Sequence, residues 1–151
     1  MVPFSRTSYV GQQLPGERND CTVRALMTVT GAPYAEAHAL LASSCGRRPG
    51  RCVSMHDITR LLNSGEAVLG SRFSAVRGVG ICGFVYGLPP GDRSNRDAPK
   101  TLVSFARAFP RGAFYVLKRG HAFAVVDGTV VDTWKVGDRS VVIGAWRVER
   151  V

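Results

Sequence analysis

The chain has 151 residues, of which 45% are hydrophobic and 21% are charged. This length predicts one domain, residues 1–151, that buries its own core. No apolar run is long enough for a transmembrane helix, and the first ten residues lack the apolar stretch of a secretory signal. We therefore expect a cytoplasmic protein without a membrane partner.

The charge is strongly basic, because 20 Lys and Arg stand against 11 Asp and Glu, a net charge of +9. Such a surface favours acidic partners, including an acidic protein or peptide, and attracts nucleic acid non-specifically. Arg47, Arg48 and Arg51 cluster in one loop, but no recognition helix or aromatic RNA-binding motif accompanies them. The composition thus predicts a solvated basic surface rather than a specific nucleic-acid reader.

The cysteines are expected to be reduced thiols, since the chain has no secretory signal. The four are Cys21, Cys45, Cys52 and Cys82. No C-x-x-C occurs and no paired-histidine motif accompanies the others, so neither a zinc site nor any other metal or cofactor is expected.

The first predicted element is a helix over 20–30, after an irregular segment at 1–18 that Pro and Gly punctuate. Asp20 is expected to cap its N-terminus, and Gly31 follows its last turn. Apolar spacing of three and four residues predicts further helices. They lie at 33–43, 54–63 and 99–109.

The stretch 64–97 is rich in Gly and gives only a short candidate strand at 81–86 and a polar loop at 87–97. The last forty residues change character and alternate like strands. These strands are predicted at 113–118, 121–126, 129–134 and 140–148. With helices first and an antiparallel sheet after them, the layout is α+β.

Cys21 lies at the start of the first predicted helix. A helix N-terminus favours an anion, so a thiol there can be held as the reactive thiolate. Most free cysteines are small buried hydrophobes instead. The polar lead-in, Arg18 to Asp20, favours the reactive alternative.

His121 is the best candidate for a base among three histidines. His38 lies inside a predicted helix and His56 at the start of another, where packing or solvation explains them. His121 opens the strand that ends at the two-residue turn Asp127-Gly128.

The hairpin register predicts that His121 and Asp132 share one face as diagonal neighbours, about 7–8 Å apart at Cβ. Asp132 could then orient the imidazole and stabilise its charged form. Asp127 is the rival acid, but Asp before Gly is turn chemistry. Trp134 is expected opposite His121, as a shield from water or as core.

Acyl transfer also needs hydrogen-bond donors for an oxyanion. The backbone N–H of Cys21 is one candidate. The side chains of Gln12, Gln13 and Asn19 are alternatives for the second, and the sequence does not choose between them.

Three segments together resemble the papain-like cysteine peptidase superfamily, and in particular its small phage- or prophage-encoded members. They are Arg18-Asn19-Asp20-Cys21-Thr22-Val23-Arg24-Ala25-Leu26, Gly31-Ala32-Pro33-Tyr34-Ala35-Glu36-Ala37 and Gly120-His121-Ala122-Phe123-Ala124-Val125-Val126-Asp127-Gly128. The resemblance implies a papain-like domain with Cys21 as nucleophile, His121 as base and Asp132 as orienting acid. The superfamily usually places a glutamine six residues before the cysteine, and here that position is Pro15.

The expected function is hydrolysis of a peptide or isopeptide bond by a Cys-His-Asp triad through an acyl-enzyme. Transfer of the acyl group to an amine is chemically close. The alternative is a non-catalytic phage-encoded binding module on the same fold, such as a virion component or an inhibitor of a host-defence protein. Either protein would act in the bacterial host cytoplasm or in the virion.

Overall fold

The computed structural model describes residues 1–6, 20–48, 50–76, 79 and 101–151. The candidate strand at 81–86 and the loop at 87–97 lie outside these residues. So do Cys82 and most of the segment predicted to be irregular.

All four predicted helices are present, with ends that differ by up to three residues. They are α1 (Cys21–Thr30), α2 (Tyr34–Cys45), α3 (Met55–Leu62) and α4 (Leu102–Ala108). Ser54 caps α3 as its sequence indicates, since its hydroxyl accepts a hydrogen bond from the Asp57 N–H at 3.1 Å. Thr101 caps α4 in the same way through the Ser104 N–H, which explains why this helix begins later than predicted.

The four predicted C-terminal strands are also present. They are β3 (Ala113–Lys118), β4 (His121–Val126), β5 (Thr129–Asp132) and β6 (Gly144–Arg150). Three of their bounds were wrong, since β5 ends two residues early, and β6 begins four residues late and ends two residues late. Two further strands were missed. They are β1 (Phe4–Arg6) and β2 (Ser71–Ala75).

The strands form one six-stranded sheet in the order β1-β5-β4-β3-β6-β2. The prediction of a purely antiparallel sheet was wrong, because β1 pairs with β5 in parallel. A three-residue strand that joins a partner at the far end of the sequence leaves no hairpin signal. The sheet is therefore mixed, and the fold class is α+β.

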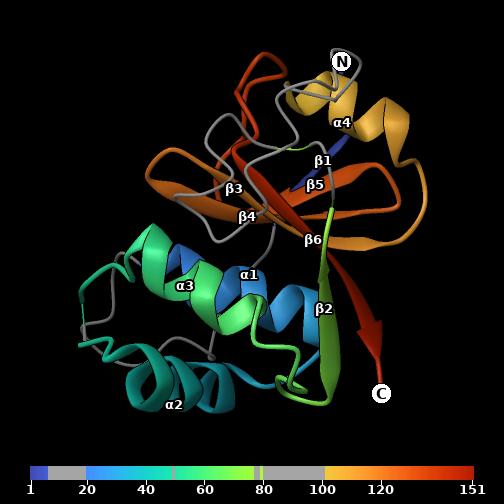
Figure 1. Ribbon diagram of the computed structural model, residues 1–151. Coiled ribbons are helices and arrows are strands. Elements are labelled where there is room, and N and C mark those ends of the chain that lie inside the picture. The colour runs from blue at the N-terminus through green and yellow to red at the C-terminus, as the bar shows by residue number, and fades with distance from the viewer. Residues whose placement is uncertain (7–19, 49, 77–78, 80–100) are drawn as a thin grey trace.

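The sheet separates two apolar clusters. Helices α1, α2 and α3 cover one face, and α4 packs on the other (Figure 1). Successive residues of β3 alternate between them, with Tyr115 in the first cluster and Phe114 in the second. The expected packing of N-terminal helices on the sheet holds for the three that precede β2.

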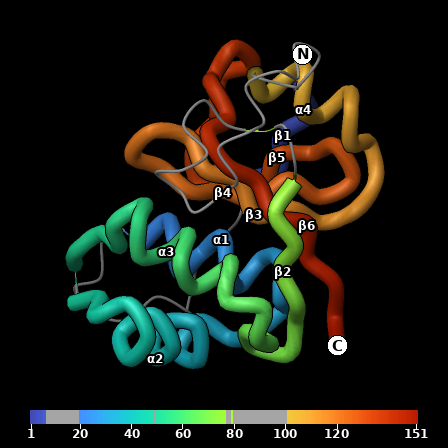
Figure 2. Tube along the Cα trace, in the orientation of Figure 1, coloured from blue at the N-terminus to red at the C-terminus, as the bar shows by residue number. Residues whose placement is uncertain are grey.

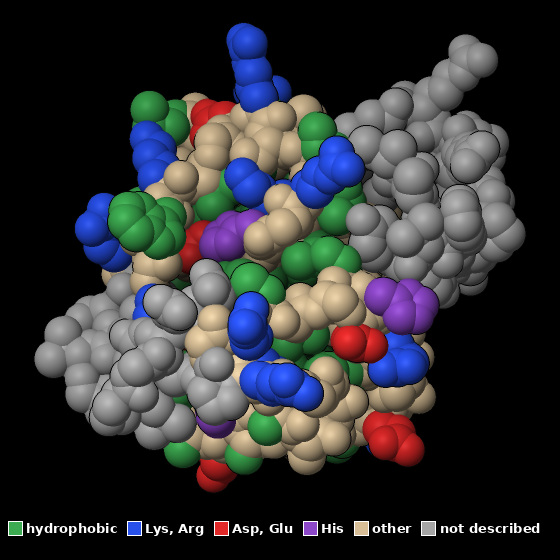
Figure 3. Space-filling model, turned by 90° about the vertical axis from the view of Figure 1, so that its left-hand side faces the viewer, with side chains coloured by type: hydrophobic (Ala, Val, Ile, Leu, Met, Phe, Trp, Pro, Cys, Tyr) green, Lys and Arg blue, Asp and Glu red, His purple; other side chains and the backbone are tan. Residues whose placement is uncertain are grey.

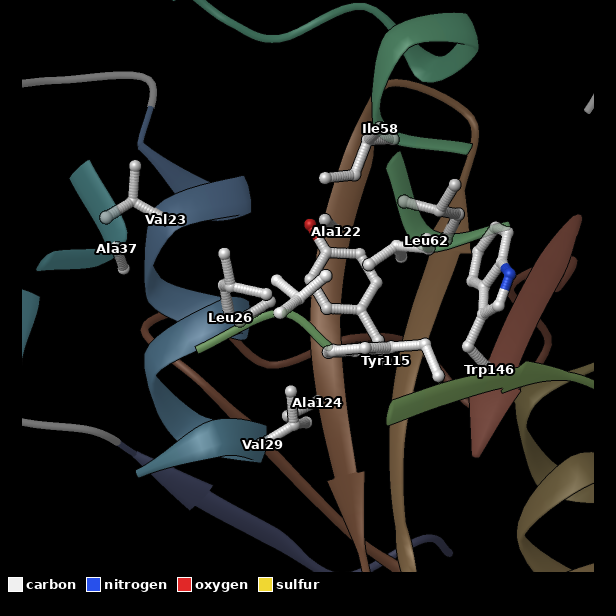
Figure 4. Packing of buried hydrophobic residues seen from close by; sticks show 14 of the residues in the cluster. Val23, Leu26, Val29, Ala37, Ile58, Leu62, Tyr115, Ala122, Ala124 and Trp146 are labelled. Atoms are coloured by element: carbon white, nitrogen blue, oxygen red, sulfur yellow. The ribbon is translucent and has the colours of Figure 1, made fainter. Parts of the chain in front are cut away.

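Helix α1 is fixed to the sheet by one buried stripe, and it runs along β4 (Figure 2). Val23, Leu26 and Val29 follow helical spacing and are at most 5% exposed. Leu26 and Val29 lie toward Tyr115 and Ala124 of the sheet, while Val23 lies beside Ala37 of α2 (Figure 4). Burial of one such aliphatic side chain contributes about 1.5–3 kcal/mol, so α1 and the residue at its start are firmly anchored.

Candidate active site

The hairpin of β4 and β5 has the predicted register. Asp127 and Gly128 both have positive φ, 48° and 76°, as a type I′ turn requires, and Val126 pairs with Thr129. The carboxylate of Asp127 is exposed and accepts a hydrogen bond from the Gly112 N–H at 2.8 Å. It therefore serves the turn, at the opposite end of β4 from His121.

The register brings His121 and Asp132 together. Nε2 of His121 lies 2.6 Å from Oδ2 of Asp132, whose residue is only 5% exposed. The second carboxylate oxygen accepts a hydrogen bond from the Thr133 N–H at 2.7 Å. The imidazole also stacks on Phe123, with 5.9 Å between ring centroids. The ring is thus held by one carboxylate and by one aromatic neighbour on its own strand.

Cys21 is the first residue of α1, and its side chain is partly exposed. A side-chain hydrogen bond from Cys21 is the second cause of the raised pKa of His121, so the thiol lies within reach of the imidazole. Since Nε2 faces Asp132, Nδ1 is the ring nitrogen left for the sulfur. The structure therefore joins a thiol, an imidazole and a carboxylate in one chain of contacts from two distant parts of the sequence.

These contacts raise the pKa of His121 from 6.5 to about 9. The main cause is the hydrogen bond to Asp132, and the hydrogen bond to Cys21 comes next. Burial acts in the opposite direction, because it disfavours the charged ring. At neutral pH the imidazole is accordingly protonated, a state that stabilises a neighbouring thiolate.

Asp20 is the N-cap residue of α1, as predicted, but its side chain makes no capping hydrogen bond. Its carboxylate turns aside to Arg24 Nε at 2.7 Å and to the Tyr34 hydroxyl at 2.8 Å. A guanidinium and a phenol on two helices together outcompete the backbone N–H groups that a capping carboxylate would take.

Sequence reasoning missed Arg24 and Tyr34 as neighbours of this site. Asp20 and Arg24 are four residues apart at the start of one helix, and this spacing could have predicted that Arg24 pairs with Asp20. Tyr34 reaches Asp20 only through the packing of α2 on α1, which the sequence pattern does not specify.

The candidate oxyanion side chains, Asn19, Gln13 and Gln12, lie outside the described residues, as does Pro15. The remaining candidate, the backbone N–H of Cys21, lies in the first turn of α1. The carboxylate of Asp20 does not occupy the amides of this turn.

The other histidines and cysteines have separate environments. His38 stacks on Tyr34 with 6.0 Å between centroids, and His56 is exposed on α3. The three described cysteines are free thiols, of which Cys52 is exposed. Burial raises the pKa of Cys45, and Asp57 raises it further.

Trp134 corrects one prediction. It lies beyond the end of β5 and is 73% exposed, so it does not belong to the core. The strand ends before it because Thr133 turns back to hydrogen-bond the carboxylate of Asp132. The tryptophan is left facing solvent, two residues from the candidate acid.

No group of three or more His, Cys, Asp or Glu side chains in the described part of the chain could hold a metal ion. Within the same residues, the helices are too short or too polar to cross a bilayer. Comparison of the chain with known protein families, curated proteins and solved structures finds no match in any of the three.

Proposed function

We propose that this protein is a cysteine-nucleophile hydrolase of the papain-like kind that cleaves a peptide or isopeptide bond. The observation that carries the proposal is the contact chain from Cys21 through His121 to Asp132. Cys21 can act as the nucleophile and His121 can carry the proton. Asp132 is the buried acceptor that orients the imidazole.

The raised pKa of His121 favours a protonated imidazole at rest. In this proposal the imidazolium is paired with a thiolate on Cys21. The thiolate of Cys21 attacks the substrate carbonyl carbon and forms a C–S bond. The tetrahedral oxyanion then collapses and breaks the C–N bond. The leaving amine takes its proton from the imidazolium, which leaves a thioester and a neutral His121.

Hydrolysis of the thioester reverses these roles. Neutral His121 takes a proton from water, and the hydroxide attacks the thioester carbonyl. The C–S bond breaks, the carboxylic acid product leaves, and the ion pair is restored. An amine in place of water would complete an acyl transfer by the same steps.

The start of α1 supports the charged intermediates of both steps. The backbone N–H of Cys21 is directed to the same end of the helix as its sulfur, where the helix dipole favours negative charge. Because Asp20 binds Arg24 and Tyr34 instead, its carboxylate does not add a negative charge over the amides of the first turn.

Alkylation with iodoacetamide tests the proposal without knowledge of the substrate. At pH 6 we expect Cys21 to react at least about tenfold faster than the exposed Cys52, measured by peptide mapping. His121→Ala should abolish this advantage, and His56→Ala, a change on exposed α3, should leave it intact.

A screen of peptides and isopeptide-linked conjugates should then reveal an acyl-enzyme on Cys21 by intact mass. If Cys21 reacts no faster than Cys52 and is indifferent to His121→Ala, the protein is not a hydrolase of this kind. The non-catalytic binding module would then be the better account.

A further inference from the structure

The residue before the candidate nucleophile carries a buried charge. Asp20 is 5% exposed, and the side chain of its partner Arg24 is 15% exposed. Removing a carboxylate from water is costly unless it is paired and hydrogen-bonded. Arg24 Nε at 2.7 Å and the Tyr34 hydroxyl at 2.8 Å supply both.

This arrangement departs from the usual behaviour of aspartate at a helix start. An N-cap aspartate normally folds its carboxylate over the N–H groups of the first turn. A negative charge there would occupy those amides and repel a thiolate on the next residue. In this chain the carboxylate is drawn aside and its charge is balanced.

A second tyrosine fixes the same turn from the sheet. The hydroxyl of Tyr115 on β3 donates to the Thr22 carbonyl at 3.3 Å, and this contact is buried. The first turn of α1 is therefore tied to α2 through Asp20 and Tyr34, and to the sheet through Thr22 and Tyr115.

We propose that Asp20, Arg24 and Tyr34 act as positioning residues for Cys21, by holding the Asp20 carboxylate off the helix N-terminus and neutralising it. The role of Cys21 in this inference rests on the proposed function. Arg24 is the charge that decides the effect, since without it the negative charge of Asp20 would be unbalanced on the residue next to Cys21.

Among the residues that the structure describes, four elements contribute charged or titratable groups that bear on Cys21. His121 on β4 and Tyr115 on β3 interact with it electrostatically, Asp132 on β5 acts through His121, and Arg24 lies on α1 itself. Burial raises the pKa of Tyr115 well above 10, so this phenol stays neutral in the range of the test.

The test is the pH profile of Cys21 alkylation in the full chain. Arg24→Met should shift the profile to higher pH by at least about half a unit, roughly threefold slower labelling at pH 6. Adding Asp20→Asn to that variant should return the profile to that of the parent protein, because the uncompensated charge is gone. Tyr34→Phe should shift it in the same direction as Arg24→Met by a smaller amount.

A merely structural role gives a different result. Both Arg24→Met and the double variant would then lower the melting temperature while the pH profile stays in place, and this would overturn the proposal. If Arg24→Met does not fold, the test rests on Tyr34→Phe. An unchanged pH profile of Cys21 alkylation in that variant would also overturn the proposal.

Failure of this inference is distinct from failure of the proposed function. The parent protein could label rapidly at Cys21 and form an acyl-enzyme while Arg24→Met and Tyr34→Phe leave the pH profile unchanged. The protein would then be a hydrolase in which Asp20, Arg24 and Tyr34 do not position Cys21. Shifted profiles in a protein that forms no acyl-enzyme would support the network and contradict the hydrolase.

Discussion

The hydrogen bond between His121 and Asp132 couples folding to pH. A pKa raised to about 9 in the folded chain, against 6.5 for a free imidazole, means that only the folded state holds the proton between these values. The stabilisation is fully present below about pH 6.5 and is lost as the pH rises through about 9. Its size is about 3 kcal/mol at most, from the difference of the two values.

We therefore expect the free energy of unfolding to fall between pH 6.5 and pH 9 in the parent protein. In Asp132→Asn this fall should be much smaller, because the main cause of the raised pKa is removed. Urea denaturation across this range measures both slopes. Equal slopes in the two proteins would show that the pair does not stabilise the fold.

Asp132 should also matter for the reaction. Asp132→Asn keeps the shape of the side chain but removes the charge that stabilises the imidazolium. We expect kcat/KM on a responsive peptide to fall by at least about a hundredfold. Asp127→Asn is the matched control, since Asn-Gly also suits the type I′ turn, and it should keep nearly full activity. Similar losses in both variants would count against Asp132 as the orienting acid.

At the scale of elements, the turn between β4 and β5 determines which residues meet. Gly128 has a φ of 76°, which disfavours any residue with a Cβ, although a Cβ there would find ordinary contact distances to Pro110. Gly128→Ala should therefore cost about 1–2 kcal/mol through backbone strain.

Gly137→Ala is the control for this prediction, because Gly137 lies outside the left-handed region and has similar space. It should change the free energy of unfolding by less than about 0.5 kcal/mol. Chemical denaturation compares the two variants. If both are neutral, the turn does not specify the register through its backbone.

The predictable elements were those with local signals. Helices α1 to α4 have apolar residues at helical spacing, and the Asp127-Gly128 turn defined the pairing that brings His121 to Asp132. Strand β1 has only three residues, and its partner β5 lies far away in the sequence, so no local pattern predicts it. Strand β2 lies in a stretch rich in Gly, which hid its alternation.

The candidate site was predicted to a similar extent. The three candidate side chains, Cys21, His121 and Asp132, followed from helix-start chemistry and from strand register. The orientation of the Asp20 carboxylate could not be predicted, because it depends on how α2 packs on α1 and on the position of the Tyr34 hydroxyl. The exposure of Trp134 was equally hidden, since the end of β5 is decided by a hydrogen bond within one residue pair.

At the scale of the whole molecule, the charge of +9 bears on substrate choice. Lys and Arg side chains are spread over the face shown in Figure 3. Lys118 pairs directly with His121 across β3 and β4, and the exposed Arg119 follows it. The end of the sheet that carries the candidate pair is therefore positive, which suits an acidic peptide.

We expect acidic peptides to have a higher kcat/KM than neutral ones, and this preference should weaken as salt is added. Arg119→Glu should lower kcat/KM for acidic peptides by about tenfold and spare neutral ones. Arg72→Glu on β2 is the matched control, since β2 lies three strands from β4, about 14 Å away. Equal effects of the two reversals would point to net charge alone. Inhibition by polynucleotide at low salt would show that nucleic acid competes for this surface.

The pairing of β1 with β5 has a consequence for how the protein is made. Phe4, Ser5 and Arg6 pair with Val130, Val131 and Asp132, so β1 can join the sheet only after β5 has been made. Cys21 likewise meets its imidazole only after β4 has emerged. A nascent chain would therefore hold Cys21 without its imidazole partner until β4 has been made.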